Sequence, residues 1–186
     1  METLADRRRR FREQMNRREA MIVPGAGNAL TARVIADSQF EAVYVTGAGI
    51  ANTHLGTPDI GLVTLTELAA TVSTIAEICQ LPLVVDIDTG FGNAINTRRT
   101  VRLIERAGGF AMQIEDQVFP KKCGHFSGKA VIPVEEALSK IKAAVDARED
   151  ENTMIIARTD ARAIDGIEAA LDRAAVSYTH LTLPTT

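Results

Sequence analysis

Short apolar runs alternate with helical periodicity along this chain. Five runs rich in β-branched residues end in polar or glycine-containing turns, at 20–26, 42–49, 81–92, 109–117 and 153–161. Such runs are typical of buried parallel strands. Between them, apolar residues recur at helical spacing at 29–38, 66–79, 97–107 and 134–148. The alternation of strand and helix predicts an α/β fold with a parallel sheet.

Two helix starts carry local signals. Thr66 with Glu67 is expected to open the helix at 66–79, and Pro133 stands where a first helical turn tolerates proline. The sheet itself admits two closures, an open doubly wound sheet or a (β/α)8 barrel. The dinucleotide-binding glycine pattern is matched only weakly by "GAGNAL", and no acidic residue ends the second run.

Polar residues at the ends of several strands favour the barrel, because its sites are built at the carboxyl ends of many strands. This chain has such residues at Thr46, Asp86, Asp88, Gln113, Glu115, Arg158 and Asp160. Strand side chains alternate faces, so residues two apart, such as Asp86 and Asp88, are expected to share a face. Several carboxylates buried together are costly without a cation. The pattern therefore predicts a metal.

Magnesium suits such a site, because it prefers oxygen ligands and keeps several waters. Asp86, Asp88 and Glu115 are the candidate ligands, and Asp59 in the loop "GTPDIG" is a fourth. An alternative is that some of these carboxylates cap helices or accept backbone hydrogen bonds. For Asp59 the sequence leaves the two interpretations balanced.

One cysteine lies in an unusual setting, "FPKKCGHFSGKAVIP" at 119–133. Lys121 and Lys122 precede Cys123, and His125 follows it. Nearby cations favour a thiolate, which acts as a nucleophile or a general acid–base group. The alternative is a surface loop with an incidental cysteine. Zinc is disfavoured, because Cys79 falls in a predicted helix and the chain has 3 histidines.

Composition excludes some partners. The chain has 186 residues and a formal net charge of −3, which gives no electrostatic reason for binding nucleic acid or an anionic membrane. The basic segment "RRRRFREQMNRRE" is expected to be a solvated helix face. No apolar run reaches the ~20 residues of a membrane span. With two cysteines and no signal peptide, we expect a cytoplasmic protein with reduced thiols.

The motifs together resemble a known superfamily. "KKCGH" after "IEDQ", with "DIDTGFGN" upstream and "IARTDA" downstream, is similar to the isocitrate lyase/phosphoenolpyruvate mutase superfamily, and closest to its methylisocitrate and 2,3-dimethylmalate lyase branch. The resemblance runs from about Arg8 to Ala174. It implies a magnesium-dependent (β/α)8 TIM barrel, with manganese as an alternative metal, of which this chain holds about five βα units.

The implied reaction is carbon–carbon cleavage of a 2-hydroxy di- or tricarboxylate to pyruvate or glyoxylate plus a dicarboxylate. The resemblance makes Asp88 the direct magnesium ligand and gives Asp59, Asp86 and Glu115 contacts through water. It makes Cys123 the general acid. The alternatives are an oxaloacetate- or phosphonate-handling enzyme, or an inactive fragment.

The resemblance also assigns the substrate pocket. Arg158 would bind a substrate carboxylate, and Lys121, Gly124 and His125 would belong to the loop of Cys123. The oxo-acid half would contact Thr46, Gly47 and Ala48. This chain has threonine and alanine where the lyases often have serine and glycine, and Gln113 where they commonly have histidine. These departures leave the substrate open.

The end of the chain does not follow the superfamily pattern. After the helical pattern of "GIEAALDRAA", the segment "VSYTHLTLPTT" is β-branched, nearly uncharged and out of register with a helix. We expect a partial barrel domain at 1–174 and an artefactual tail, in which His180 has no role. Five strands leave open edges, so the chain alone is expected to be poorly stable and weakly active. Longer relatives are expected to be homotetramers.

Overall fold

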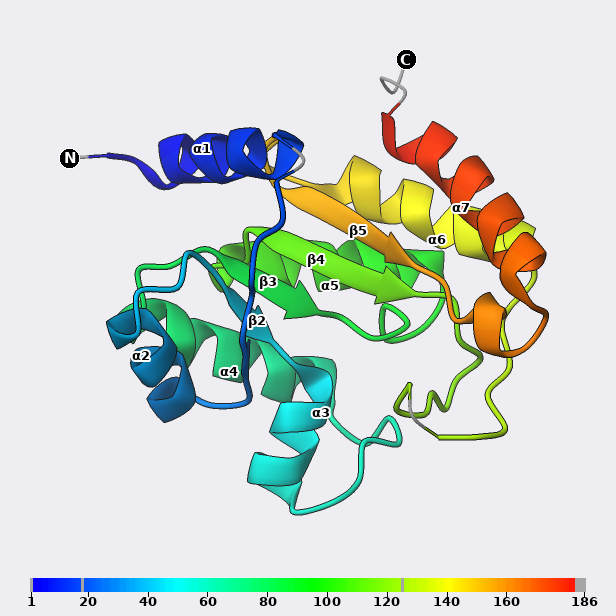
Figure 1. The fold of residues 1–186 in the computed structure, drawn as a ribbon, viewed down its shortest axis with the longest axis horizontal. Coiled ribbons are helices and arrows are strands. Elements are labelled where there is room, and N and C mark those ends of the chain that lie inside the picture. Colours follow the sequence, from blue (N-terminus) through cyan, green and yellow to red (C-terminus); the bar gives the residue numbers. More distant parts are fainter. Residues whose placement is uncertain (1, 18, 125, 183–186) are drawn as a thin grey trace.

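A single parallel sheet organises the molecule (Figure 1). The computed structural model describes residues 2–17, 19–124 and 126–182. Five strands lie in chain order, each parallel to the next. They are β1 (Gly25–Ala26), β2 (Val43–Val45), β3 (Leu83–Asp86), β4 (Ala111–Glu115) and β5 (Met154–Arg158). The predicted parallel α/β architecture is confirmed.

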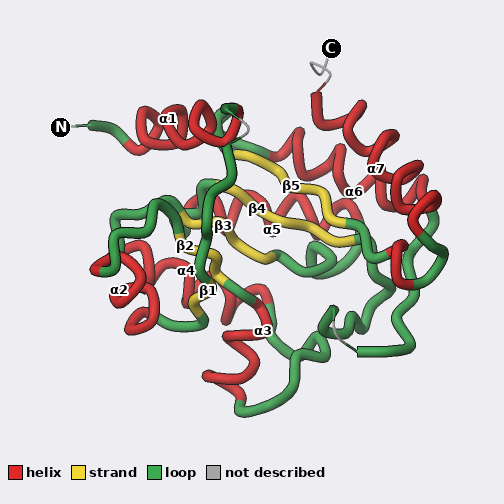
Figure 2. The backbone as a smooth tube through the Cα atoms, in the orientation of Figure 1, coloured by secondary structure: helices red, strands yellow, loops and turns green. Residues whose placement is uncertain are grey.

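Helices connect the strands and lie mainly on one side of the sheet (Figure 2). They are α1 (Leu4–Asn16), α2 (Ala29–Asp37), α3 (Gly47–Ile50), the π-helical turn η1 (Ala51–Leu55), α4 (Leu65–Ile78), α5 (Ala94–Arg106), α6 (Val134–Ala147), the 3₁₀ turn η2 (Ala161–Ala163) and α7 (Ile167–Thr182). None of the described helices is long and apolar enough to cross a bilayer.

Side-chain alternation along the strands divides the core into two clusters. Val43 and Val45 of β2 are fully buried among residues of α2 and α4, in the larger cluster. Tyr44, between them, packs in the smaller cluster with Val84 and Ala111 on the other face of the sheet. Consecutive strand residues point to opposite faces. The first face therefore holds the helices, and the second corresponds to the inside of a barrel.

Helix α1 closes the end of the sheet at which the strands begin. Phe11 packs edge to face on Phe110, with ring centroids 6.1 Å apart. Arg8 is buried and donates to the carbonyl oxygens of Glu105 and Gly109. The arginine-rich segment forms the predicted helix, but the expectation of a merely solvated face was wrong for Arg8 and Phe11.

Several predicted boundaries shift by a few residues. The expected strand at 42–49 ends at Val45, because Thr46 caps α3 by accepting a hydrogen bond from the Gly49 N–H at 3.3 Å. Thr64, rather than Thr66, caps α4 and forms a capping box with Glu67.

The helix near the end of the chain is longer than expected. Helix α7 continues through Thr182, whereas residues after 174 were predicted to leave the helix. That prediction was wrong, because Ala174, Ala175 and Val176 permit the helix started upstream to propagate. The side chain of His180 lies outside what the structure describes.

Candidate active site

The predicted polar residues meet at the carboxyl ends of the strands. Asp86 is the last residue of β3, Glu115 the last of β4 and Arg158 the last of β5. The strand register pairs Asp86 with Gln113 and Glu115 with Arg158. Parallel pairing therefore aligns these side chains along one rim of the sheet.

Asp88 reaches this rim through a turn. Its φ of 48° lies in the left-handed region, which is uncommon for a residue other than glycine. The Asp88 N–H donates to Asp86 Oδ1 at 3.2 Å. Asp86 and Asp88 lie on the same side, beside Gly47, as the sequence predicted, although β3 ends at Asp86 and the turn carries Asp88 there.

Lys121 binds two of the predicted metal ligands. Its Nζ lies 2.7 Å from Asp59 Oδ2 and 2.6 Å from Asp88 Oδ1. All three residues are more than nine-tenths buried. The contact with Asp88 lacks the alignment of a hydrogen bond and is an ion pair. Burial lowers the pKa of Lys121, but the two carboxylates outweigh burial and raise the pKa above its usual range.

Glu115 is incompletely compensated. Its Oε2 lies 3.6 Å from Arg158 Nη1, whereas its buried Oε1 has no hydrogen-bond partner among the described residues. Burial, opposed by Arg158 and reinforced by Asp86, raises the pKa of Glu115 to about 8. Burial and the Asp86 charge, opposed by Lys121, raise the pKa of Asp88 to about 7. The rim thus gathers more negative charge than its cations neutralise.

The donor set at this rim fits a hard divalent cation. Asp59, Asp86, Asp88 and Glu115 offer only carboxylate oxygens, and one Glu115 oxygen is buried without a protein donor. In the part of the chain that the structure describes, no three His, Cys, Asp or Glu side chains are spaced to hold a metal ion. The ammonium of Lys121 instead lies between Asp59 and Asp88. The chemistry of the residues fits magnesium, and their role as ligands remains a prediction.

Gly47 contributes room beside the carboxylates. A Cβ at this position would lie 3.1 Å from Asp88 Oδ1 and 3.6 Å from Asp86 Oδ2. The backbone that follows β2 therefore approaches the acidic rim closely. Ala48, next in the chain, lines a cavity of about 410 Å³ together with Asp59 and Cys123.

The cysteine loop lies over this rim. The Cys123 N–H donates to the Asp59 carbonyl oxygen at 3.0 Å, and the residue is half-buried. A Cβ on Gly124 would lie 3.0 Å from Arg158 Nη2, so the loop backbone passes directly against the guanidinium. The structure thus brings Lys121, Cys123, Gly124 and Arg158 together. His125 lies outside the described residues.

Tyr44 is a site residue that sequence reasoning missed. Its hydroxyl accepts a hydrogen bond from Gln113 Nε2 at 2.8 Å. Burial, reinforced by the Asp86 carboxylate, raises the pKa of Tyr44 above its usual range, so the phenol stays protonated. The available signal was its position two residues before Thr46, which places both on one strand face.

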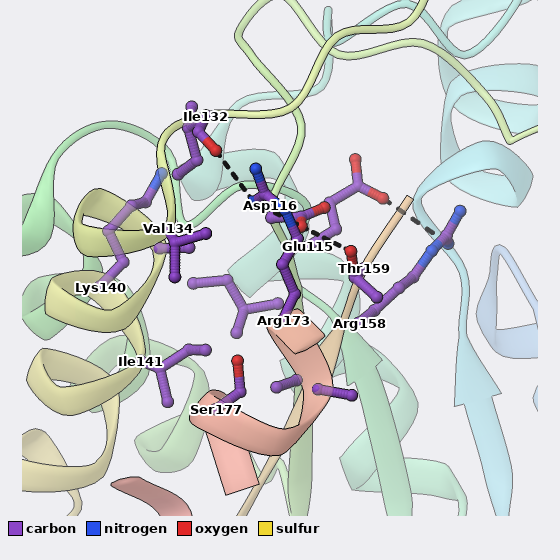
Figure 3. A pocket seen from close by; sticks show the side chains of 14 residues that line it. Glu115, Asp116, Ile132, Val134, Lys140, Ile141, Arg158, Thr159, Arg173 and Ser177 are labelled. Atoms are coloured by element: carbon purple, nitrogen blue, oxygen red, sulfur yellow. Dashed lines mark hydrogen bonds and ion pairs between the residues drawn. The ribbon is translucent and has the colours of Figure 1, made fainter. Parts of the chain in front are cut away.

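A second cavity of about 230 Å³ lies between β4, β5, α6 and α7. Figure 3 shows that Lys140 and Ile141 reach it from one helix and Arg173 and Ser177 from the other. Asp116 accepts hydrogen bonds here from Thr159 at 2.7 Å and Arg173 at 3.2 Å. Glu115 and Arg158 also line it, so this cavity borders the acidic rim from the helix side.

Comparisons with known proteins agree on one family. The family model for phosphoenolpyruvate phosphomutase matches residues 11–179. The 2,3-dimethylmalate lyase of Eubacterium barkeri is 50% identical over 164 residues, covering 88% of this chain and 57% of the relative. The 2-methylisocitrate lyase of Aeropyrum pernix is 51% identical over 164 residues, covering 88% and 52%. The chain therefore spans little more than half of these relatives.

Solved structures with the same fold cover several chemistries. A crystal structure of 2,3-dimethylmalate lyase, a PEP mutase/isocitrate lyase superfamily member, matches 97% of this chain and 60% of its own, with a TM-score of 0.88 and 34% identity. Oxaloacetate acetylhydrolase with 3,3-difluorooxalacetate matches 97% and 62%, with a TM-score of 0.90 and 32% identity. Phosphonopyruvate hydrolase with oxalate and Mg²⁺ matches 94% and 60%, with a TM-score of 0.85 and 27% identity.

Proposed function

The chain belongs to the phosphoenolpyruvate phosphomutase family, within the PEP mutase/isocitrate lyase superfamily, and on that premise we propose that it serves a magnesium-dependent carbon–carbon lyase. The substrate class is a 2-hydroxy di- or tricarboxylate such as 2-methylisocitrate or 2,3-dimethylmalate. The products are an oxo acid, pyruvate or glyoxylate, and the remaining fragment, which is a dicarboxylate from a tricarboxylate substrate and a monocarboxylate from a dicarboxylate substrate. The proposed compartment is the cytoplasm.

One observation carries this proposal: the Cys123–Gly124 segment lies over the rim, against both Asp59 and Arg158. The Cys123 N–H is bonded to Asp59, and Gly124 passes against the guanidinium of Arg158. Cleavage of a 2-hydroxy acid leaves a carbanion stabilised by a carboxylate, and the reaction is completed by a proton. Cys123 is the residue before Gly124, and we propose that its thiol delivers that proton.

Each residue at the rim has a role in this scheme. Arg158 would bind the substrate carboxylate with its planar fork, and Glu115 and Asp160 fix its orientation at 3.6 and 3.3 Å. Lys121 would hold Asp59 and Asp88 in place. Thr46, Gly47 and Ala48 would contact the oxo-acid half, with Gly47 providing room for it.

The metal would be held by the four carboxylates of the rim. We propose Asp88 as the direct ligand, and Asp59, Asp86 and Glu115 as partners through water. A bound divalent ion would stabilise negative charge on the substrate oxygen that becomes the carbonyl. The same carboxylate oxygens would also suit Mn²⁺ as ligands. The raised pKa values of Asp88 and Glu115 support the need for a cation at this rim.

The test is an assay of oxo-acid release. The chain is offered 2-methylisocitrate, 2,3-dimethylmalate and isocitrate with Mg²⁺, and released pyruvate or glyoxylate is measured by coupled reduction. We expect release from one substrate, its loss with a chelator, and a fall of at least about 100-fold in Cys123→Ser, the scale of general acid catalysis. A Cys123→Ser variant that kept the full rate would overturn the role of the thiol.

A second candidate is hydrolysis of oxaloacetate or a phosphonate. The fold likeness to oxaloacetate acetylhydrolase and phosphonopyruvate hydrolase favours it. Oxalate formation from oxaloacetate, or phosphate from phosphonopyruvate, without release of oxo acid from any 2-hydroxy acid would replace the lyase proposal. An absence of turnover with every substrate would favour the inactive-fragment alternative.

We propose that residues 1–174 form a partial barrel domain, that the family pattern is lost within residues 175–186, where the family match ends at residue 179, and that longer relatives are homotetramers. The chain in this structure leaves β1 and β5 as the first and last strands of the described sheet. Exposed strand edges reduce stability and favour association.

A further inference from the structure

We propose that Lys129 and Asp160 form a positioning pair that holds the Cys123–Gly124 segment against Arg158. Neither residue was expected from the sequence to have a role beyond the polar character of Asp160. The inference rests on the proposed function for the chemistry that Cys123 performs. The geometric part, that this pair fixes the segment, stands on contacts within the structure.

Lys129 lies five residues after Gly124 in the same loop, and its side chain reaches back across the loop to that residue. Its Nζ donates to the Gly124 carbonyl oxygen at 2.9 Å and to Asp160 Oδ1 at 2.9 Å. The Lys129 side chain is 6% exposed, although Gly124 and the neighbouring residues Ser127 and Gly128 are exposed. A long side chain buried beneath exposed backbone acts as an internal support for that backbone.

Asp160 anchors the other end of this support. Its Oδ2 accepts a hydrogen bond from Gln117 Nε2 at 3.2 Å, and lies 3.3 Å from Arg158 Nε. Its own N–H donates to Asp116 Oδ1 at 2.9 Å, which fixes the backbone after β5. The Asp160 carboxylate thus contacts Lys129 in the loop, Gln117 at the start of the loop and Arg158 at the rim.

The charge state of Asp160 suits this role. Burial raises its pKa, but Lys129 and Arg158 outweigh burial and hold the pKa below the usual range. Asp160 therefore remains ionised near neutral pH. Its bonds to Lys129 and Arg158 are charge-assisted, and such bonds are roughly twice as strong as neutral ones.

The contacts of Lys129 end beside the reacting groups. Gly124 follows Cys123 directly, and Asp160 orients Arg158. Other described bonds secure the base of the loop, where the Val118 N–H donates to the Ala130 carbonyl oxygen and Gln117 binds the backbone of Lys122. Loss of Lys129 would leave that base and the Cys123 N–H bond to Asp59 intact, and would loosen the segment at Gly124, beside the thiol.

The test measures the reactivity of Cys123 in the full chain. Iodoacetamide labelling is followed by peptide mass spectrometry, which separates Cys123 from Cys79, a residue only 3% exposed. We expect Lys129→Met to raise the alkylation rate of Cys123 about tenfold, the effect of losing a charge-assisted bond. Lys129→Arg, which keeps the charge and the reach, is expected to restore slow labelling.

Matched variants separate positioning from general stability. Lys142→Met makes the same substitution on α6, where Lys142 pairs with Asp146 in an exposed i,i+4 contact, and should change neither labelling nor melting temperature by a measurable amount. Asp160→Asn keeps the side-chain shape and should accelerate labelling as Lys129→Met does. The double variant should label no faster than the faster single variant, because both remove one interaction.

The possible results separate cleanly. Unchanged labelling in both Lys129→Met and Asp160→Asn would overturn the pair, as would faster labelling accompanied by a melting temperature lowered as for a globally loosened protein. If Lys129→Met does not fold, the labelling rates of Asp160→Asn and Lys129→Arg test the pair in its place. Accelerated labelling in a chain that cleaves no hydroxy acid would leave the pair standing and reject only the proposed function.

Discussion

Replacement of Lys121 by methionine removes the cation that Asp59 and Asp88 share. The two carboxylates lie 2.7 and 2.6 Å from its Nζ, and all three side chains are at most one-tenth exposed. The substitution keeps most of the length of the side chain but leaves two buried carboxylates without this partner. We expect the cost in free energy of unfolding to depend on pH, because Asp88 can take up a proton.

The expected magnitude follows from the burial of the group. Removal of one partner of a buried ion pair costs about 3 to 5 kcal/mol. The pKa of Asp88 is about 7 in the fold, above the ~3.9 of an unfolded aspartate. Folding thus favours the protonated form of Asp88, and the stability that this form contributes is lost as the pH rises through 7. Lys121 opposes the rise in the pKa of Asp88, so its loss raises that pKa further. The cost that comes from Asp88 is therefore small at pH 6, where this carboxyl is mostly protonated in both proteins, and grows as the pH rises above 7.

Thermal unfolding at pH 6 and pH 8.5 measures the effect. For a chain of this size about 3 kcal/mol corresponds to a fall of roughly 6 to 12 °C in melting temperature. Lys142→Met is the control, and added MgCl₂ should raise the melting temperature of Lys121→Met more than that of the unmodified chain. A variant that melts with the control at both pH values would refute the reasoning that Lys121 compensates these carboxylates.

Three further predictions concern the rim and its support. Mg²⁺ affinity should rise as pH increases from 6 to 9, because the raised pKa values of Asp88 and Glu115 mean that protons must leave before a cation binds; calorimetry in two buffers would detect their release, and a flat profile would contradict it. Gly47→Ala should weaken Mg²⁺ binding at unchanged fold, since its Cβ would lie 3.1 Å from Asp88 Oδ1; calorimetry at one pH suffices, and wild-type affinity would argue against crowding. Glu105→Gln should lower the free energy of unfolding, measured by urea titration, by about 1 to 3 kcal/mol without altering Mg²⁺ affinity. The reason is that the Glu105 carboxylate accepts hydrogen bonds from the Glu149 N–H, the Asp150 N–H and the Thr153 hydroxyl.

Hydrophobic periodicity was sufficient for the five strands and for helices α2, α4, α5 and α6. Each predicted apolar run contains one strand, because residues such as Val43 and Val45 are buried on the helix side and could not be accommodated elsewhere. The residues at which strands and helices begin and end were harder to predict, since they depend on side-chain hydrogen bonds. Thr46 ends β2 by capping α3, and a threonine is equally compatible with a strand.

The site was predictable in its members more than in its contacts. Strand ends and the cysteine motif identified Asp86, Glu115 and Arg158 correctly as neighbours on one rim. The ion pairs of Lys121, by contrast, span 62 residues to Asp59, and no local pattern encodes such a distance. The same holds for Lys129 and Asp160, which meet only because the loop folds back onto β5.

The docking of α1 has a consequence for the order in which the chain can fold. Arg8 contacts carbonyl groups 97 and 101 residues later and the Asp150 carboxylate 142 residues later. During synthesis α1 is complete long before these partners are made, so Phe11 stays exposed until Phe110 is available to pack against it. Contacts of such long range close slowly. Helix α1, made before the other described helices, is thus among the last of them to reach its final position, and chaperone binding should concentrate on it in that interval.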